Sequence, residues 1–255
     1  MSARIIFITG TDTGVGKTVL TSLLLCHLRR TGQRALALKP FCSGGRADAQ
    51  LLYKLQEGDL TLDQVNPFYY PEPVAPLISA RKHKHPVLLE TALKCIQEIA
   101  SGISRLATVS PGKSQSELQE FLLVEGSGGL LVPLGEGYTV RDLIARLGAE
   151  VLVVARNRLG TINHTLLTVE ALPGRSTIRR KWPRALEASA SLRPRIVLVQ
   201  TSKPDPSCQT NPRILKELLS PCTFVELPFL GRSCASAKKM KIAAAKYSSR
   251  LQQMV

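Results

Sequence analysis

A glycine-rich run near the start of the sequence has the residue types of a phosphate-binding loop. Residues 9–18 read TGTDTGVGKT and end in Lys17 and Thr18. The common loop pattern is G-x-x-x-x-G-K-[ST], but five residues separate Gly10 from Gly16 here, where the pattern has four. In such loops the backbone N–H groups surround phosphates, the lysine reaches the β- and γ-phosphates, and the next hydroxyl can bind Mg²⁺. The run therefore predicts a nucleotide-binding loop of unusual spacing.

Two further charged residues stand where predicted strands end. Lys39 closes the apolar run RALALK and precedes Pro40, while Glu125 closes FLLVE just before the glycine-rich residues 126–129. Polar residues at the ends of parallel strands commonly line a ligand site. Taken alone, Lys39 is also compatible with a surface lysine, and Asp48 with a cap for a helix that begins near it.

The elements that would position these residues alternate between strand and helix. The predicted strands cover residues 4–9, 34–39, 121–125, 150–155, 195–200 and 223–228. The predicted helices cover about 17–30, 163–172 and 235–252, and another begins near residue 47. This alternation predicts an α/β, P-loop NTPase-like fold, a mostly parallel sheet with helices on both faces. We expect one domain over residues 1–255, with surface insertions at 101–116 and 173–194.

The chain is strongly basic, with a formal net charge of +15 at pH 7. Residues 173–195 carry seven arginines and lysines against one acid, and residues 227–255 contain no acid. A basic stretch can bind nucleic acid, but aromatic residues, which stack on bases, make up only 5% of the chain. We therefore interpret the charge as a solvated surface and expect no nucleic-acid partner.

Cysteine usage and hydropathy suggest a compartment. The six cysteines form no C-x-x-C pair and show no zinc spacing. No stretch approaches the roughly 20 apolar residues of a membrane span, and no secretory signal is recognised. We expect a cytoplasmic protein with reduced thiols and no membrane partner.

Five segments, in order, resemble the motifs of dethiobiotin synthetases. They are GTDTGVGKT (10–18), KPFCSGGRADA (39–49), VNPFYYPEPVAP (65–76), VEGSGGLLVPL (124–134) and LGTINHTLLTVEAL (159–172). The resemblance runs from about residue 4 to 172 and more weakly to about 231. It implies a homodimeric Mg-ATP-dependent ligase of biotin biosynthesis. Such enzymes form the ureido ring of dethiobiotin from 7,8-diaminopelargonic acid, CO₂ and ATP, through a carbamate and a carbamic–phosphoric anhydride.

The resemblance also implies roles for individual residues. The catalytic residues would be Lys39, Lys17 and Thr13. The metal ligands would be Thr18, Asp48 and Glu125. The nucleotide phosphates would be held by Gly14, Val15, Gly16, Lys17, Thr18, Val19, Asp48, Glu125, Gly126, Ser127 and Gly128. The base would lie against Gln200, Pro228, Phe229 and Leu230. The diamine substrate would contact Ser43 and, across a dimer interface, Gly160, Thr161, Ile162 and Asn163.

The sequence departs from this family at two places. Gln200 stands where an asparagine usually reads adenine, which leaves the nucleotide preference open. The basic residues 173–195 replace a short turn. Two alternatives follow: a ParA- or MinD-like ATPase switch that binds DNA, and a relative that has lost activity. Against the first, Asp12 stands where partition ATPases carry a loop lysine. Against the second, every residue implied for catalysis and for the metal is present.

Overall fold

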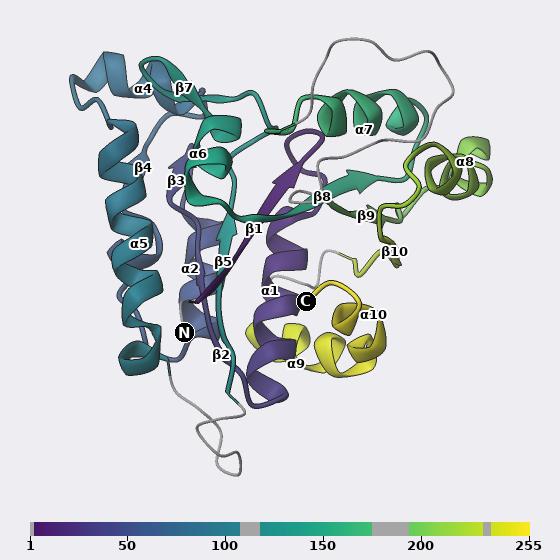
Figure 1. Ribbon diagram of the computed structural model, residues 1–255, viewed down its shortest axis with the longest axis horizontal. Helices are drawn as coiled ribbons and strands as arrows, with labels where there is room; N and C mark the ends of the chain where they lie inside the picture. The colour runs from purple at the N-terminus through teal and green to yellow at the C-terminus, as the bar shows by residue number, and fades with distance from the viewer. Residues whose placement is uncertain (1–2, 108–117, 175–193, 232–235) are drawn as a thin grey trace.

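A six-stranded sheet forms the centre of the computed structural model, which describes residues 3–107, 118–174, 194–231 and 236–255 (Figure 1). Across the sheet the strands are β2 (Arg34–Leu38), β5 (Glu120–Glu125), β1 (Arg4–Gly10), β8 (Glu150–Arg156), β9 (Arg195–Val199) and β10 (Phe224–Leu227). All neighbouring pairs are parallel. The predicted α/β fold with a mostly parallel sheet is confirmed.

The strand sequences explain why this sheet is buried on both faces. The central strands β1, β5 and β8 are runs of branched and aromatic apolar residues, and Ile6, Ile8 and Leu122 have no exposed surface. A continuous apolar strand needs cover on both sides, and parallel strands obtain it from their crossover helices.

Helices cover the two faces according to the direction of each crossover (Figure 1). The crossover from β1 to β2 runs toward one edge, and those from β2 to β5, β5 to β8, β8 to β9 and β9 to β10 run toward the other. Right-handed crossovers therefore place the first on one face and the rest on the opposite face. On the first face lies α1 (Lys17–Arg30). Helix α2 (Ala47–Leu55) is part of the connection from β2 to β5 but packs against α1 on this first face, and α9 (Ala237–Lys246) and α10 (Ser248–Gln252), which follow the last strand, also pack against α1. On the second lie α5 (Leu89–Leu106), α6 (Val140–Leu147), α7 (Thr161–Glu170) and α8 (Asn211–Leu218).

Small elements complete the described fold. The short strands β3 (Phe41–Ser43) and β4 (Phe68–Tyr70) pair in parallel, and β6 (Pro133–Gly135) and β7 (Tyr138–Thr139) pair antiparallel. The remaining elements are α3 (Leu62–Val65), α4 (Pro76–His83) and the 3₁₀ turn η2 (Pro206–Gln209). No helix among the described residues is long and apolar enough to span a bilayer.

Several predicted boundaries need correction. Residues 101–106 are not part of a surface insertion, because they form the last turns of α5 and Ile103 is fully buried. Residues 108–116 and 175–193, the rest of the two expected insertions, lie outside the described residues. Helix α7 begins at Thr161 rather than near 163, and the predicted C-terminal helix is divided into α9 and α10 at Tyr247.

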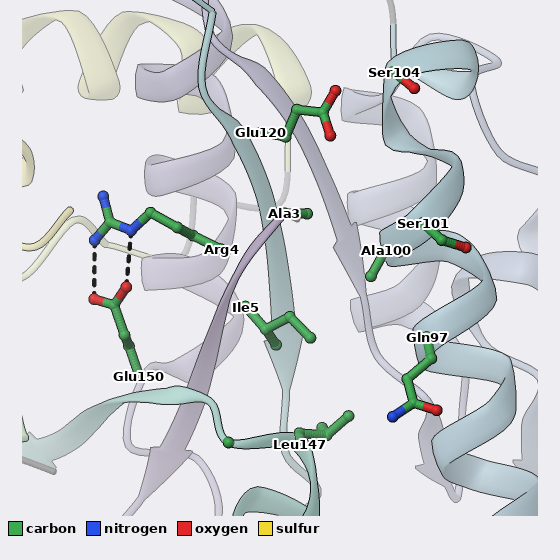
Figure 2. Close-up of a pocket in the computed structure, with 11 residues that line it drawn as sticks. Ala3, Arg4, Ile5, Gln97, Ala100, Ser101, Ser104, Glu120, Leu147 and Glu150 are labelled. Atoms are coloured by element: carbon green, nitrogen blue, oxygen red, sulfur yellow. Dashed lines mark hydrogen bonds and ion pairs between the residues drawn. The ribbon is translucent and has the colours of Figure 1, made fainter. Parts of the chain in front are cut away.

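An ion-pair cluster joins three strands at their amino ends, beside a hollow of about 820 Å³ that lies away from the predicted chemistry. Figure 2 shows the Arg4–Glu150 pair of this cluster. Arg4 donates two hydrogen bonds to the carboxylate of Glu150, at 2.8 and 2.9 Å, and Arg195 donates a third at 2.8 Å. The hydrogen bond from Arg4 outweighs burial, and with Arg195 it holds the pKa of Glu150 below its ordinary value.

We expect Glu150→Gln to lower the free energy of unfolding at pH 7, and the difference to disappear on acidification. A carboxylate whose folded pKa is depressed stabilises the protein above its unfolded pKa, and this contribution is lost as the pH falls through the folded value. Urea unfolding at pH 7 and pH 3 measures the effect, with Glu98→Gln in an exposed pair as the control. An equal difference at both pH values would contradict the assignment.

Candidate active site

The predicted loops meet at the carboxyl end of the sheet. The loop after β1 lies between those that follow its neighbours β5 and β8, where the direction of the crossovers reverses. Such a switch point is where open α/β sheets bind ligands. A cavity of about 320 Å³, called the loop cavity below, opens there. Its lining includes Lys17, Lys39, Ser43, Asp48 and Glu125.

The loop cavity is shaped by glycines in residues 10–16. Gly16 precedes α1 with φ of 109°, a conformation that favours glycine over residues with a side chain. A Cβ atom added to Gly10 would lie 2.7 Å from a methyl group of Val15, so this position also excludes a side chain. Both ends of the longer loop are thus fixed by close packing or backbone conformation. Residues 16–19 at the start of α1 line the cavity, which is the arrangement of anion sites at helix termini.

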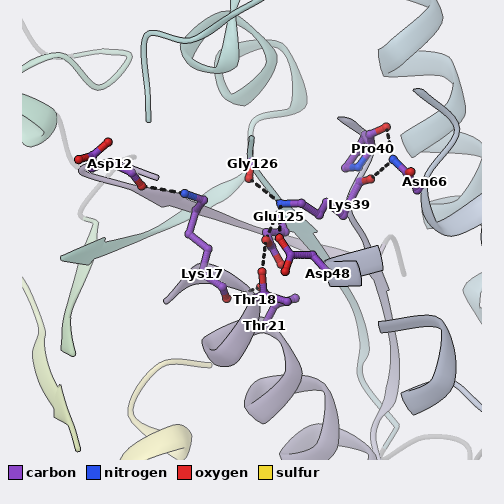
Figure 3. Close-up of polar contacts among 10 residues, drawn as sticks. All are labelled: Asp12, Lys17, Thr18, Thr21, Lys39, Pro40, Asp48, Asn66, Glu125 and Gly126. Atoms are coloured by element: carbon purple, nitrogen blue, oxygen red, sulfur yellow. Dashed lines mark hydrogen bonds and ion pairs between the residues drawn. The ribbon is translucent and has the colours of Figure 1, made fainter. Parts of the chain in front are cut away.

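A hydrogen bond to the backbone of this loop holds the Lys17 side chain in place (Figure 3). Its Nζ donates to the backbone carbonyl of Asp12 at 2.9 Å, and the side chain is almost completely buried. Burial lowers the pKa of Lys17 to about 8, and the nearby charge of Lys39 acts in the same direction. Two cations with little solvent around them form a site that an anion would stabilise.

Lys39 lies on the other side of the cavity, at the end of β2 (Figure 3). Its Nζ donates to Oε1 of Glu125 at 2.6 Å and lies 3.7 Å from Oδ2 of Asp48. Burial by itself would lower the pKa of Lys39, but the two carboxylates outweigh it and raise the pKa. The lysine therefore carries its charge inside the protein. The side-chain amide of Asn66 donates to the carbonyls of Lys39 and Pro40, which fixes the end of the strand.

Glu125 presents one carboxylate oxygen without a protein partner. Its Oε1 accepts hydrogen bonds from Lys39 and, at 2.7 Å, from the hydroxyl of Thr18. Its Oε2 is buried and has no hydrogen-bond partner among the described residues, and the same holds for Oγ of Ser43. Because buried polar atoms are seldom left unpaired, these two atoms indicate a place for a ligand.

A second cavity of about 470 Å³, called the side cavity below, adjoins the first. Gly14, Gly16 and Val19 line both cavities. The side cavity brings together the residues predicted to contact a base, which are Gln200, Pro228, Phe229 and Leu230. It also contains the predicted loop residue Val15.

The structure gathers most, but not all, of the predicted site residues. Thr13, Thr18, Ser127 and Gly128 also line the loop cavity. Gly126 does not line it; its carbonyl accepts from Lys39 at 3.4 Å, and a Cβ atom added to Gly126 would lie 3.0 Å from a ring carbon of Phe7. Asp48 lies in the first turn of α2 and makes no capping hydrogen bond, so the capping alternative is not supported.

The predicted substrate residues Gly160, Thr161, Ile162 and Asn163 line neither cavity. They form the amino end of α7, beside the exposed Leu159. Within one copy of the described chain they are therefore separate from the loop cavity.

Sequence reasoning missed several residues that shape the two cavities. Cys42 and Gly45 line the loop cavity within the segment that contains Ser43. Arg156 ends β8 and Asn157 follows it, and the guanidinium of Arg156 donates to the carbonyl of Gly14. Asn157 has no exposed surface and contacts Gln200. Their position after a predicted strand was the available signal.

A lysine-bearing glycine loop between the first strand and first helix of a parallel sheet defines a P-loop nucleotide-binding protein. A family model described as an AAA domain matches residues 4–182. The chain belongs to the ATP-dependent dethiobiotin synthetase family. It is 42% identical to the enzyme of that name from Anaeromyxobacter sp. (strain Fw109-5) over 179 residues, 69% of this chain and 73% of the relative. It is 35% identical to that of Thermodesulfovibrio yellowstonii over 240 residues, 88% of each chain. The predicted resemblance is confirmed.

Similarity to solved structures supports the fold class. The cell-division protein MinD of Aquifex aeolicus matches with a TM-score of 0.54 at 14% identity, covering 99% of this chain and 95% of MinD. A ParA family ATPase from Chlorobium tepidum TLS matches with a TM-score of 0.55 at 12% identity, covering 98% and 96%. At these identities the likeness concerns the fold alone, so it does not favour the DNA-switch alternative.

Proposed function

We propose that this chain is an ATP-dependent dethiobiotin synthetase that closes the ureido ring from 7,8-diaminopelargonic acid, CO₂ and ATP. The observation that carries the proposal is a pair of buried lysines, Lys17 and Lys39, on opposite sides of one cavity. Glu125 lines the same cavity at the end of β5, the strand between β1 and β2. Family membership supplies the reaction, and the two lysines supply a reason why this cavity suits it. We also propose that the protein is cytoplasmic.

The reaction brings several negative groups together. One amine of the substrate takes up CO₂ as a carbamate, whose oxygen attacks the γ-phosphate of ATP and releases ADP. The second amine then attacks the carbamoyl carbon, closes the ring and expels phosphate. Lys39 would hold the carbamate against the transferring phosphoryl group, and Lys17 would neutralise charge on the phosphates. Thr13 and Ser43 would orient the reacting groups. Positioning and charge stabilisation are the main contributions that proteins make to such transfers.

The loop cavity also fits a magnesium ion. Thr18, Asp48 and Glu125 offer hard oxygen atoms there, and the unpaired Oε2 of Glu125 is the observation that supports an additional ligand. No group of three or more His, Cys, Asp or Glu side chains gathers as a metal cage among the described residues. Mg²⁺ usually takes only one or two carboxylates and completes its shell with waters and phosphates, so this donor set is sufficient. When bound, the ion would neutralise charge on the phosphates.

The substrate's carboxylate tail would bind at the amino end of α7 of a second copy. Gly160, Thr161, Ile162 and Asn163 form the amino end of a helix, which favours an anion, although the N–H of Thr161 already donates to the carbonyl of Arg158 at 3.1 Å. These residues lie outside the loop cavity of their own chain. Leu159 and Leu167 on the same segment are 79% and 61% exposed. A homodimer that covers these leucines would bring the residues to the partner's cavity.

We expect ADP release from Mg-ATP only when both 7,8-diaminopelargonic acid and bicarbonate are present. Each is required because the phosphoryl acceptor is the carbamate that they form together. A coupled assay of ADP, combined with mass spectrometry of the ring product, measures the dependence. ADP release that ignores both compounds, or the absence of ring product, would contradict the proposed function.

A further inference from the structure

We propose that Asn157 fixes the orientation of the Gln200 amide, so that the side cavity prefers nucleotides whose base carries an amino group at purine C6 or pyrimidine C4 over those with a carbonyl at that position. The preferred bases are adenine and cytosine, and the disfavoured ones are hypoxanthine, guanine and uracil. This inference rests on the proposed use of a nucleotide. It goes beyond it by naming a positioning residue and a class of base.

Backbone register places the two amides side by side at the carboxyl edge of the sheet. The N–H of Asn157, just after β8, donates to the carbonyl of Val199 at 2.8 Å. The N–H of Gln200, just after β9, donates to the carbonyl of Leu227 at 2.9 Å. Neighbouring strands therefore present both side chains at the same level. Gln200 lines the side cavity, whereas Asn157 lies behind it with no exposed surface.

A backbone carbonyl decides which way the Asn157 amide points. Its Nδ2 lies 2.9 Å from the carbonyl oxygen of Cys208, which can only accept a hydrogen bond. The atom that faces Cys208 must therefore be the nitrogen. The same nitrogen lies 2.9 Å from Oε1 of Gln200, so its second hydrogen requires an acceptor at that position. This requirement sets Gln200 with its oxygen toward Asn157.

Further contacts support the same orientation from both ends. Nδ2 of Asn211 donates to Oδ1 of Asn157 at 2.9 Å and lies 3.2 Å from the carbonyl of Arg158, another group that only accepts. At the far end, Nε2 of Gln200 lies 3.3 Å from a carboxylate oxygen of Glu226. Reversing Gln200 would set its nitrogen against the nitrogen of Asn157 and its oxygen against the carboxylate of Glu226. Rotation of the amide is therefore disfavoured.

A fixed amide can pair with only one order of donor and acceptor on a base. Adenine and cytosine each present an exocyclic amino donor beside a ring-nitrogen acceptor. Hypoxanthine, guanine and uracil present a carbonyl acceptor beside a ring N–H, which is the reverse order. A freely rotating glutamine can serve both orders, whereas one held by Asn157 serves the first.

Affinities of wild-type protein for ATP and ITP, and for CTP and UTP, test the proposal by calorimetry without diamine or bicarbonate. ITP differs from ATP only in the 6-carbonyl and the adjacent ring N–H, which replace the amino group and the ring-nitrogen acceptor of adenine. We expect the amino member of each pair to bind roughly tenfold to a hundredfold more tightly, the discrimination typical of a two-bond base contact. Equal affinity for ATP and ITP would overturn the proposal without any variant.

The variant Asn157→Leu tests whether Asn157 orients the Gln200 amide or contributes only to the stability of the fold. It removes the hydrogen bond that orients Gln200 while keeping a side chain of similar size. The ratio of the affinity for ATP to the affinity for ITP should therefore fall toward one. Thr210→Val is the matched control, because it removes a hydroxyl from the same segment that bonds only to the Ser207 carbonyl. A folded Asn157→Leu protein with the wild-type ratio of ATP to ITP affinity would refute the role of Asn157.

The binding experiment does not depend on ring formation, which the separate assay of ring product measures. Base-selective binding by a protein that forms no ring product would therefore refute the proposed function and leave this inference standing. Failure to bind any nucleotide would refute both.

Discussion

Lys39→Met is expected to reduce ring formation by about 10²–10³-fold or more while ATP binding is nearly retained. Removing one preorganised charge-stabilising donor from an active site typically has an effect of this size. Lys39 lies opposite the phosphate-binding loop, and Lys17 with the loop N–H groups remains in place to hold ATP. Ring product by mass spectrometry and ATP affinity by calorimetry measure the two effects separately.

The same substitution has a cost in stability that the experiment must separate from catalysis. The side chain of Glu125 has no exposed surface, and without Lys39 its charge is left with a hydrogen bond from Thr18 alone. Breaking a buried ion pair in this way costs about 3–5 kcal/mol. The double variant Lys39→Met, Glu125→Gln removes both charges and should recover part of the stability but no activity.

A surface substitution provides the second control. Lys54→Met on the exposed side of α2 makes the same chemical change away from the cavity and should leave both readouts unchanged. Ring formation at the wild-type rate by a folded Lys39→Met protein would remove Lys39 from the catalytic site.

Glu125→Gln is expected to raise the Mg²⁺ concentration needed for half-maximal ADP release by at least roughly tenfold. The amide oxygen can still accept from Lys39 and Thr18, so the local packing is kept. What is lost is the negative charge and the second carboxylate oxygen, Oε2, which has no partner within the part of the chain that the structure describes. Substitutions around metal sites commonly reduce metal affinity by roughly 10–100-fold.

Titration of ADP release against Mg²⁺ at saturating ATP measures this requirement. Glu120→Gln is the matched control, because Glu120 begins the same strand, β5, at the opposite edge of the sheet and pairs with Arg34. An unchanged Mg²⁺ dependence in Glu125→Gln would place the metal elsewhere. A parallel change in Glu120→Gln would indicate an effect on the strand rather than on the ion.

The loop cavity was largely predictable because its parts are encoded locally. A strand, a glycine run and Lys17 follow one another within 14 residues, 4–17, and short-range backbone preferences decide their conformation. Lys39 and Glu125 are 86 residues apart, yet each ends a strand, and parallel strands bring their carboxyl ends to one edge. Alternation of strands and helices was therefore enough to predict that they share a site.

Local reasoning failed where packing overrides local preference. Ser101 and Gly102 favour a loop, and residues 101–116 were predicted as an insertion. In the structure α5 continues through residue 106, because Ile96 and Ile103 on its buried face pack against the core. Burial of such side chains stabilises the helix by more than the roughly 1 kcal/mol that a glycine costs.

The sequence by itself determined the class of protein, the phosphate-binding loop and the strand ends that carry Lys39 and Glu125. Only the tertiary structure decided how Gln200 is oriented. That orientation depends on Asn157, Cys208 and Asn211, which meet through the register of β8 with β9 and the docking of η2 and α8. Hydrogen bonds between residues 43 to 54 positions apart depend on distances that no local pattern specifies. The same is true of the unpaired oxygen of Glu125, which becomes evident only when every neighbour is in place.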